Sequence, residues 1–133
     1  MPLERLNPKE IYQPFGNRYT QVIRTTGATQ IHVAGIVPAD KDGNLVGEGD
    51  VAVQTEVVMD SIGKALAAAG AKPSDVARMN IYVLDVDRYL QEGHRKLMDF
   101  FGDNLPVSTL IGVTRLANPG FLVEVEVTAV LDD

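Results

Sequence analysis

Two glutamates near the end of the chain are the residues best suited to acid–base chemistry. Glu124 and Glu126 stand two apart in an apolar stretch typical of a β-strand, so both side chains lie on one face, about 7 Å apart. In a partly desolvated pocket, a carboxylate can position or activate a water molecule. A solvated sheet face carries the same alternation, because antiparallel sheets often leave one side wet. The pair therefore indicates either a water-activating site or an exposed face.

The composition excludes or disfavours several other chemistries. The chain has no cysteine, so thiolate catalysis, disulfides and thiolate metal sites are ruled out. Its two histidines, His32 and His94, are far apart in the sequence, and we expect no metal site. A net charge of −6 disfavours contact with a phosphate backbone, so we expect no nucleic-acid partner.

The length and hydropathy of the chain predict one soluble domain. The 133 residues suit a single domain over 1–133, and the contents of 45% apolar and 23% charged residues are those of a globular protein. No apolar run approaches the ~20 residues that a membrane span requires. The opening MPLERLNPKE lacks the apolar core of a signal peptide. We expect a cytoplasmic protein with no membrane partner.

Apolar periodicity and turn residues predict elements in the order ββαβαββ. One predicted helix runs from an N-cap at Asp50 to Ala69, with Gly70 after it, and the other from Asp87 to Gly102. The predicted strands cover residues 19–25, 29–37, 76–86, 107–116 and 121–131. We expect the first two strands to form a hairpin, and likewise the last two. Crossover connections then place both helices on one face of a mixed sheet, an α+β fold.

The register of the last predicted hairpin decides which residues share the face without helices. Matching the buried faces of the two strands sets Thr114 opposite Glu124, across a loop of residues 117–121. A four-residue loop would set Glu124 opposite Val113 and mix polar with apolar side chains on both faces. We therefore expect the longer loop, which places Ser108 on the same face as Glu124.

That uncovered face is predicted to be partly apolar. Leu110, Leu122 and Val130 fall on it beside the two carboxylates. Such a mixture fits a subunit interface that encloses a polar pocket. We therefore expect a homo-oligomer.

Four longer segments of the chain resemble the Rid (reactive intermediate deaminase) family, also described as endoribonuclease L-PSP. They are VAGIVPADKDGNLVGEGDVAVQT, ALAAAGAKPSDVARMNIYVLDVDRY, FFGDNLPVSTLIGVTRL and VEVEVTAV, and together they cover most of the sequence. The resemblance implies a chorismate-mutase-like fold and a homotrimer whose sheets form a closed central barrel with the helices outside. It also implies a small-molecule cleft at each subunit interface.

The resemblance further implies an enzyme activity. In deaminating members, similar clefts hydrolyse enamines and imines formed from amino acids to 2-oxo acids and ammonia, without a cofactor. Tyr19, in Arg-Tyr-Thr-Gln, and Glu124, the first glutamate of Glu-x-Glu, match the family's site residues. Glu124 would orient the attacking water. The resemblance thus identifies Tyr19 and Glu124 as catalytic candidates.

Three departures from the family pattern concern the substrate. The motif Pro-Ala-Arg-Ser is Pro106-Val107-Ser108-Thr109 here, so Ser108 replaces the arginine that grips the substrate carboxylate in a bidentate pair. Ala34-Gly35 stands where the family has Ser-Gly, and Gly93-His94 stands where active members carry an asparagine. We therefore expect substrates other than the amino-acid-derived imino acids, either neutral or differently charged.

The remaining polar residues have more than one interpretation. Ser108 and Thr109 would donate hydrogen bonds to the substrate, and Ala34 and Gly35 would line the cleft. Arg18 is a candidate replacement for the missing cation, although a surface arginine is the simpler interpretation.

The histidines are predicted to be structural. We interpret His32 as a hydrogen-bonded core or interface residue, and His94 as an exposed one.

Three functions remain open at this point. The first is a cofactor-independent enamine/imine deaminase, and the second is a non-catalytic trimer that binds or senses a small molecule. An RNA nuclease is the third, and the acidic charge makes it the least favoured.

Overall fold

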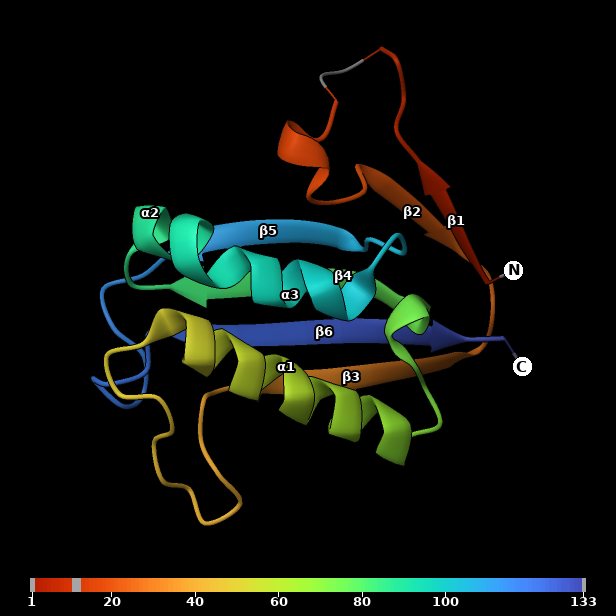
Figure 1. Cartoon of the computed structure of the whole chain (residues 1–133). Helices are drawn as coiled ribbons and strands as arrows, with labels where there is room; N and C mark the ends of the chain where they lie inside the picture. The colour runs from red at the N-terminus through yellow and green to blue at the C-terminus, as the bar shows by residue number, and fades with distance from the viewer. Residues whose placement is uncertain (1, 11–12, 133) are drawn as a thin grey trace.

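The protein has two layers, helices on one side and a sheet on the other. The computed structural model describes residues 2–10 and 13–132 (Figure 1). The strands are β1 (Leu3–Leu6), β2 (Val22–Thr25), β3 (Thr29–Ile36), β4 (Val76–Val83), β5 (Val107–Gly112) and β6 (Val123–Leu131). The helices are α1 (Val51–Ala68), α2 (Val86–Arg88) and α3 (His94–Phe101), with a π-helical turn, Tyr89–Gly93, between the last two and 3₁₀ turns at Phe15–Asn17 and Pro73–Asp75.

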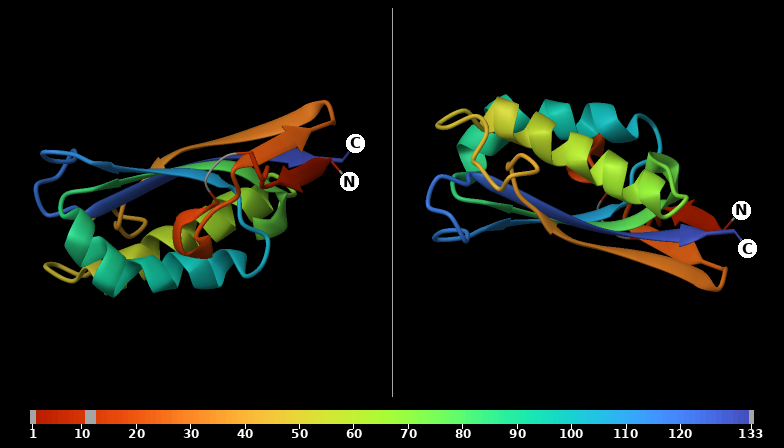
Figure 2. Two further views of the ribbon diagram at one scale, coloured as in Figure 1. Left: turned by 90° about the horizontal axis from the view of Figure 1, so that it is seen from above. Right: turned by 90° about the horizontal axis from the view of Figure 1, so that it is seen from below.

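All the long helices cover the same face of the sheet. In both views of Figure 2, α1 and α3 lie on one side of the strands, and the opposite face carries no helix formed by the described residues. This arrangement confirms the predicted α+β fold class. The homotrimeric barrel is not tested by a single chain and stays a prediction. No helix among residues 2–10 and 13–132 is long and apolar enough to cross a membrane.

Helix α1 forms as its sequence predicts. The carboxylate of Asp50 accepts a hydrogen bond from the Val53 amide at 3.1 Å, which caps the first turn. At the other end, Gly70 adopts a φ of +82°, a left-handed conformation that favours glycine and ends the helix. Both predicted ends are therefore confirmed to within one residue.

The second helical segment differs from its prediction. It begins at an N-cap on Asp85, not at Asp87, and its middle turn is π-helical. The residue pattern predicts a buried stripe of Leu90, Gly93, Leu97 and Phe100. Gly93 and Leu97 are buried as expected, whereas Leu90 and Phe100 are only partly buried and the adjacent Tyr89 and Phe101 are buried. A pattern read at a constant helical period cannot show such a shift.

Both predicted hairpins are wrong. Strand β2 pairs with β1, and β3 pairs with β6. The four-stranded sheet has the order β3-β6-β4-β5, in which β5 runs parallel to β4 and does not touch β6. The physical reason is the helical crossover between β4 and β5, because such a connection returns the chain in the same direction. Residues 113–122 then carry the chain past β4 to β6.

The new pairing reverses the orientation of β5 relative to the prediction. Ser108 lies beside Met79 and Leu110 beside Ile81, so both belong to the helix side of the sheet. Glu124 lies opposite Tyr82 in β4, and the predicted contact with Thr114 is wrong. Ser108 and Glu124 therefore lie on opposite faces of the sheet within one chain.

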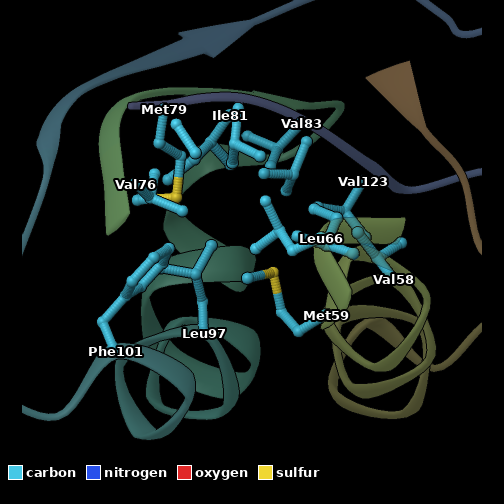
Figure 3. Packing of buried hydrophobic residues seen from close by; sticks show 14 of the residues in the cluster. Val58, Met59, Leu66, Val76, Met79, Ile81, Val83, Leu97, Phe101 and Val123 are labelled. Carbon is cyan, nitrogen blue, oxygen red and sulfur yellow. The ribbon is translucent and has the colours of Figure 1, made fainter. Parts of the chain in front are cut away.

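The core fills the space between the sheet and the helices. Figure 3 shows Leu66 and Met59 of α1 meeting Leu97 of α3 below the strand residues Ile81 and Val123. Alternate residues of β6 face this core, because Val123, Val125, Val127 and Ala129 are all buried.

The apolar residues expected on the uncovered face are not exposed there. Leu110 and Leu122 pack against the main core, and Val130 is buried beside Leu3 of β1 and Ile23 of β2. The argument for an interface from these three residues is therefore wrong. An argument that copies of this chain associate must therefore come from the distribution of the site residues.

Candidate functional site

The first group of site residues lies on the uncovered face, where β3 and β6 meet. Strand β3 has an irregularity between Val33 and Ile36, and Gly35 sits within it. A Cβ at Gly35 would lie 1.9 Å from Oε2 and 2.8 Å from Cδ of Glu124. Only glycine leaves room for the carboxylate in this position. The backbone of Gly35 and the side chain of Glu124 thus form one unit, which we call the glutamate site, with Ala34 beside it.

The two carboxylates of β6 have different surroundings. Glu126 accepts hydrogen bonds from Asn80 Nδ2 at 3.0 Å and from the Tyr82 hydroxyl. These bonds, the one from Tyr82 most of all, hold the pKa of Glu126 below its ordinary value. The side chain of Glu124 makes no hydrogen bond to any residue between 2–10 or 13–132. The carboxylate of Glu126 is therefore held by hydrogen bonds within the sheet, whereas the carboxylate of Glu124 can bind water.

A shallow hollow of about 450 Å³ lies next to the glutamate site on the same face. His32, Arg78, Asn80, Glu126 and Thr128 contribute its polar groups. His32 is exposed in the single chain, which leaves the predicted core or interface role open. Thr109 is exposed on this face too, beside Asn80 and away from Ser108.

The second group of site residues surrounds a cavity of about 180 Å³ at the β5 edge, on the helix side. We call it the β5 cavity. Its lining consists of Phe15, Arg18, Tyr19, Ile81, Leu90, His94, Ser108 and Leu110. Most of this surface is apolar, and a few polar groups converge on it, which is the common composition of a small-molecule site.

The N-terminal segment forms one wall of the β5 cavity. The Thr20 amide donates to the Pro106 carbonyl at 3.0 Å, and the Thr20 hydroxyl donates to the Leu105 carbonyl at 2.5 Å. These bonds fix residues 15–20 against the start of β5. The Tyr19 hydroxyl accepts a hydrogen bond of 3.4 Å from the Phe15 amide. Tyr19 and Ser108 both line this cavity.

His94 is not the exposed residue that the sequence predicted. Its ring is half-buried against the β5 cavity, and Nδ1 lies 2.9 Å from the hydroxyl of the buried Tyr89. Nε2 is buried and has no hydrogen-bond partner among the described residues. Burial lowers the pKa of His94, and the positive charge of Arg18 lowers it further. The π-helical turn before His94 points it inward, and no residue pattern at a constant helical period indicates that.

The predicted site residues therefore form two separate groups. Arg18, Tyr19 and Ser108 come together in the β5 cavity, while the glutamate site lies on the other face of the sheet. The sequence analysis named Gly93-His94 as a departure from the family pattern but expected His94 to be exposed, and it missed the apolar wall residues Phe15 and Leu90. Among the described residues, no group of three or more histidine and acidic side chains could hold a metal ion.

Comparisons with known proteins agree on one family. A family model described as Endoribonuclease L-PSP matches residues 12–131. The 3-aminoacrylate deaminase RutC of Acinetobacter baylyi is 30% identical over 121 residues, which are 89% of this chain and 94% of that protein. A RutC family protein of Pyrococcus abyssi is 30% identical over 111 residues, or 84% of each chain. Among solved structures, YyfB from Yersinia pestis, a protein of unknown function of the conserved Rid protein family, has a TM-score of 0.91 at 31% identity, covering 98% of this chain and 100% of that one.

Proposed function

Since the chain belongs to the endoribonuclease L-PSP family, which includes the Rid proteins, we propose that it is a cofactor-independent hydrolase of small enamines or imines. The relative named 3-aminoacrylate deaminase supports a deaminase-type reaction at the level of the family. We propose that the enzyme is a homotrimer and that its substrates differ from amino-acid-derived imino acids.

The division of the site residues is the observation that carries this proposal. The glutamate site can supply a water-activating carboxylate, and the β5 cavity can hold a small ligand, but they lie on opposite faces of one sheet. A neighbouring copy can complete the site if its uncovered face packs against the β5 edge. Closed cyclic symmetry then repeats the same contact around the ring, which gives one site per interface.

In this arrangement, Glu124 of one copy acts on a ligand held by its neighbour. Glu124 accepts a proton from water as the water oxygen attacks the imine carbon. The proton passes to the nitrogen, which gives a carbinolamine. The carbinolamine hydroxyl then releases its proton, through Glu124, to the departing nitrogen as the C–N bond breaks, and the products are a carbonyl compound and ammonia. An enamine first gains a proton on carbon and loses one from nitrogen to become the imine. Tyr19 and Ser108 donate hydrogen bonds that fix the ligand in the β5 cavity.

The substrate preference follows from the charge of the cavity. Ser108 is neutral where arginine-bearing relatives carry a cation. A carboxylate that leaves water without a paired charge loses more solvation free energy than it recovers from neutral donors. The cavity therefore favours substrates without a carboxylate at that position.

Ammonia release from a panel of enamines tests the proposal. The panel pairs imines derived from serine and threonine with neutral enamines of similar size. We expect the wild-type chain to accelerate ammonia release most for neutral members, and Glu124→Gln to lower kcat by about 100-fold or more, the usual contribution of a general base. Thermal unfolding of the variant serves as the control for its fold.

If the wild-type chain accelerates ammonia release from no member of the panel, the proposal that it is an enzyme is wrong. The non-catalytic binding trimer would then be the better account. Degradation of RNA by the wild-type chain, abolished in Glu124→Gln, would instead support a nuclease.

A further inference from the structure

We propose that His94 determines which ligands the β5 cavity accepts, by donating a hydrogen bond from Nε2–H to a neutral carbonyl oxygen of the ligand. The ligand class is a small amide, ester or ketone with an apolar body. The claim that this ligand is the substrate rests on the proposed function. The preference of the β5 cavity for a neutral carbonyl ligand does not.

The partner of Nδ1 fixes the tautomer of His94. Tyr89 is fully buried, and the one hydrogen bond that its hydroxyl makes among the described residues is to His94 Nδ1, at 2.9 Å. A buried hydroxyl hydrogen needs an acceptor, so Tyr89 donates and Nδ1 accepts. Burial also raises the pKa of Tyr89, so the hydroxyl keeps its proton. The ring proton of neutral His94 is therefore on Nε2.

The Nε2–H group is a donor that still needs an acceptor. Nε2 is buried and has no hydrogen-bond partner in the part of the chain that the structure describes. Leaving a buried donor unpaired is unfavourable, and such groups in native proteins usually meet water or a ligand. The ring of His94 lines the β5 cavity, although Nε2 itself has almost no open surface in the unliganded chain. A shift of the ring or of the cavity wall on binding would let a ligand oxygen in the cavity accept its hydrogen bond.

The charges around His94 favour a neutral acceptor over a carboxylate. Arg18 is the one charged side chain among the described residues that line the β5 cavity. It is exposed to solvent, and its Nε lies 3.1 Å from the place of a Cβ at Gly16, so the side chain folds back over its own turn. Solvent weakens the attraction between a charge in that position and a ligand carboxylate, although the charge still contributes to the lowered pKa of His94. Ser108, Tyr19 and His94, which is kept neutral by its lowered pKa, offer hydrogen bonds without charge.

The shape of the cavity favours an apolar body on the ligand. Phe15, Ile81, Leu90 and Leu110 make up half of the lining residues. A branched aliphatic group can remove this surface from water, while the carbonyl group faces His94. A matched pair of probes therefore separates the alternatives: 3-methylbutanamide and 3-methylbutanoate share one skeleton and differ in charge.

Nuclear magnetic resonance of the full-length protein tests the tautomer and the ligand together. The chain has two histidines, so ¹⁵N-histidine labelling gives a simple spectrum in which His94 can be assigned through a His94→Gln variant. At pH 7.5 we expect His94 to carry its proton on Nε2, and this proton signal to move downfield as 3-methylbutanamide is added. We expect the amide to bind at least about tenfold more tightly than 3-methylbutanoate.

Two variants separate ligand selection from a structural role. In His94→Phe, which keeps an aromatic ring but has no donor, the two probes should bind within about twofold of each other. In His94→Gln, whose carboxamide restores a neutral donor, the preference for the amide should return. A merely structural histidine would change both affinities together and leave their ratio unchanged.

Three results would overturn the inference: a proton on Nδ1, equal or tighter binding of the carboxylate, or an amide preference that survives in His94→Phe. None of these measurements requires turnover. If the protein prefers the amide but releases ammonia from no enamine, the proposed function is wrong and the role of His94 stands. If it releases ammonia but does not prefer the amide, the role of His94 is wrong and the proposed function stands.

Discussion

Replacing Gly35 with alanine should lower kcat for the best enamine substrate by about 100-fold while leaving the fold intact, because misplacing a reacting group by about 1 Å has an effect of this size. The added Cβ would lie 1.9 Å from Oε2 of Glu124, so the carboxylate must move. The atoms that clash belong to the end of a flexible side chain, and the backbone can stay in place. Steady-state ammonia release measures the effect.

Gly63→Ala is the matched control for the alanine substitution at Gly35. Its added Cβ would meet the ring of Phe100 at 3.3 Å, on the helix side and away from Glu124. We expect this variant to keep wild-type turnover, and both variants to unfold close to the wild-type temperature. Turnover in Gly35→Ala within about twofold of the wild type would show that the position of the Glu124 carboxylate does not matter.

Ser108→Arg should raise kcat/KM for the imino acid derived from serine by about tenfold, which corresponds to roughly 1.4 kcal/mol of transition-state stabilisation. The substitution places a guanidinium in the β5 cavity, where it can pair with a carboxylate through two hydrogen bonds. Neutral enamines should not share the gain. Competition between a serine-derived and a neutral substrate in one assay gives the ratio directly.

Ser108→Lys is a useful control, because it adds the same charge without the planar pair of donors and should give a smaller gain. Two results would count against the account. Efficient hydrolysis of the serine-derived imino acid by the wild type would identify Arg18 as a working carboxylate clamp. No gain in Ser108→Arg, with assembly preserved, would mean that the rest of the cavity no longer fits such substrates.

Local signals in the sequence were enough to predict the limits of α1 but not the π-helical turn of the second helical segment. The limits of α1 depend on Asp50 and Gly70, whose effects are confined to neighbouring residues. The pairing of strands could not be predicted in the same way. Strands that follow one another across a turn favour hairpins. However, β2 pairs with a segment 16 positions earlier, where Leu6 lies opposite Val22, and β5 pairs with β4 because a helical crossover joins them.

The structure divides the residues expected at the site into two groups. Tyr19 and Ser108 line the β5 cavity, and Gly35 and Glu124 lie together on the other face. Their division between two faces was missed, because alternation shows which residues share a face and not which face the helices cover. In β5 both faces are partly apolar, so the pattern contains no such information.

Mixing two defective variants tests most directly whether each active site is shared between two copies. Glu124→Gln removes the carboxylate, and Ser108→Phe fills the β5 cavity with a bulky side chain. Each alone should assemble as three chains of 14.4 kDa in sedimentation and release little ammonia. After the two are unfolded together in equal amounts and refolded, random assembly leaves about one quarter of the shared sites with both groups intact. The account predicts that the mixture recovers about a quarter of wild-type turnover. Activity no greater than the average of the two separate variants would contradict a site built from two copies.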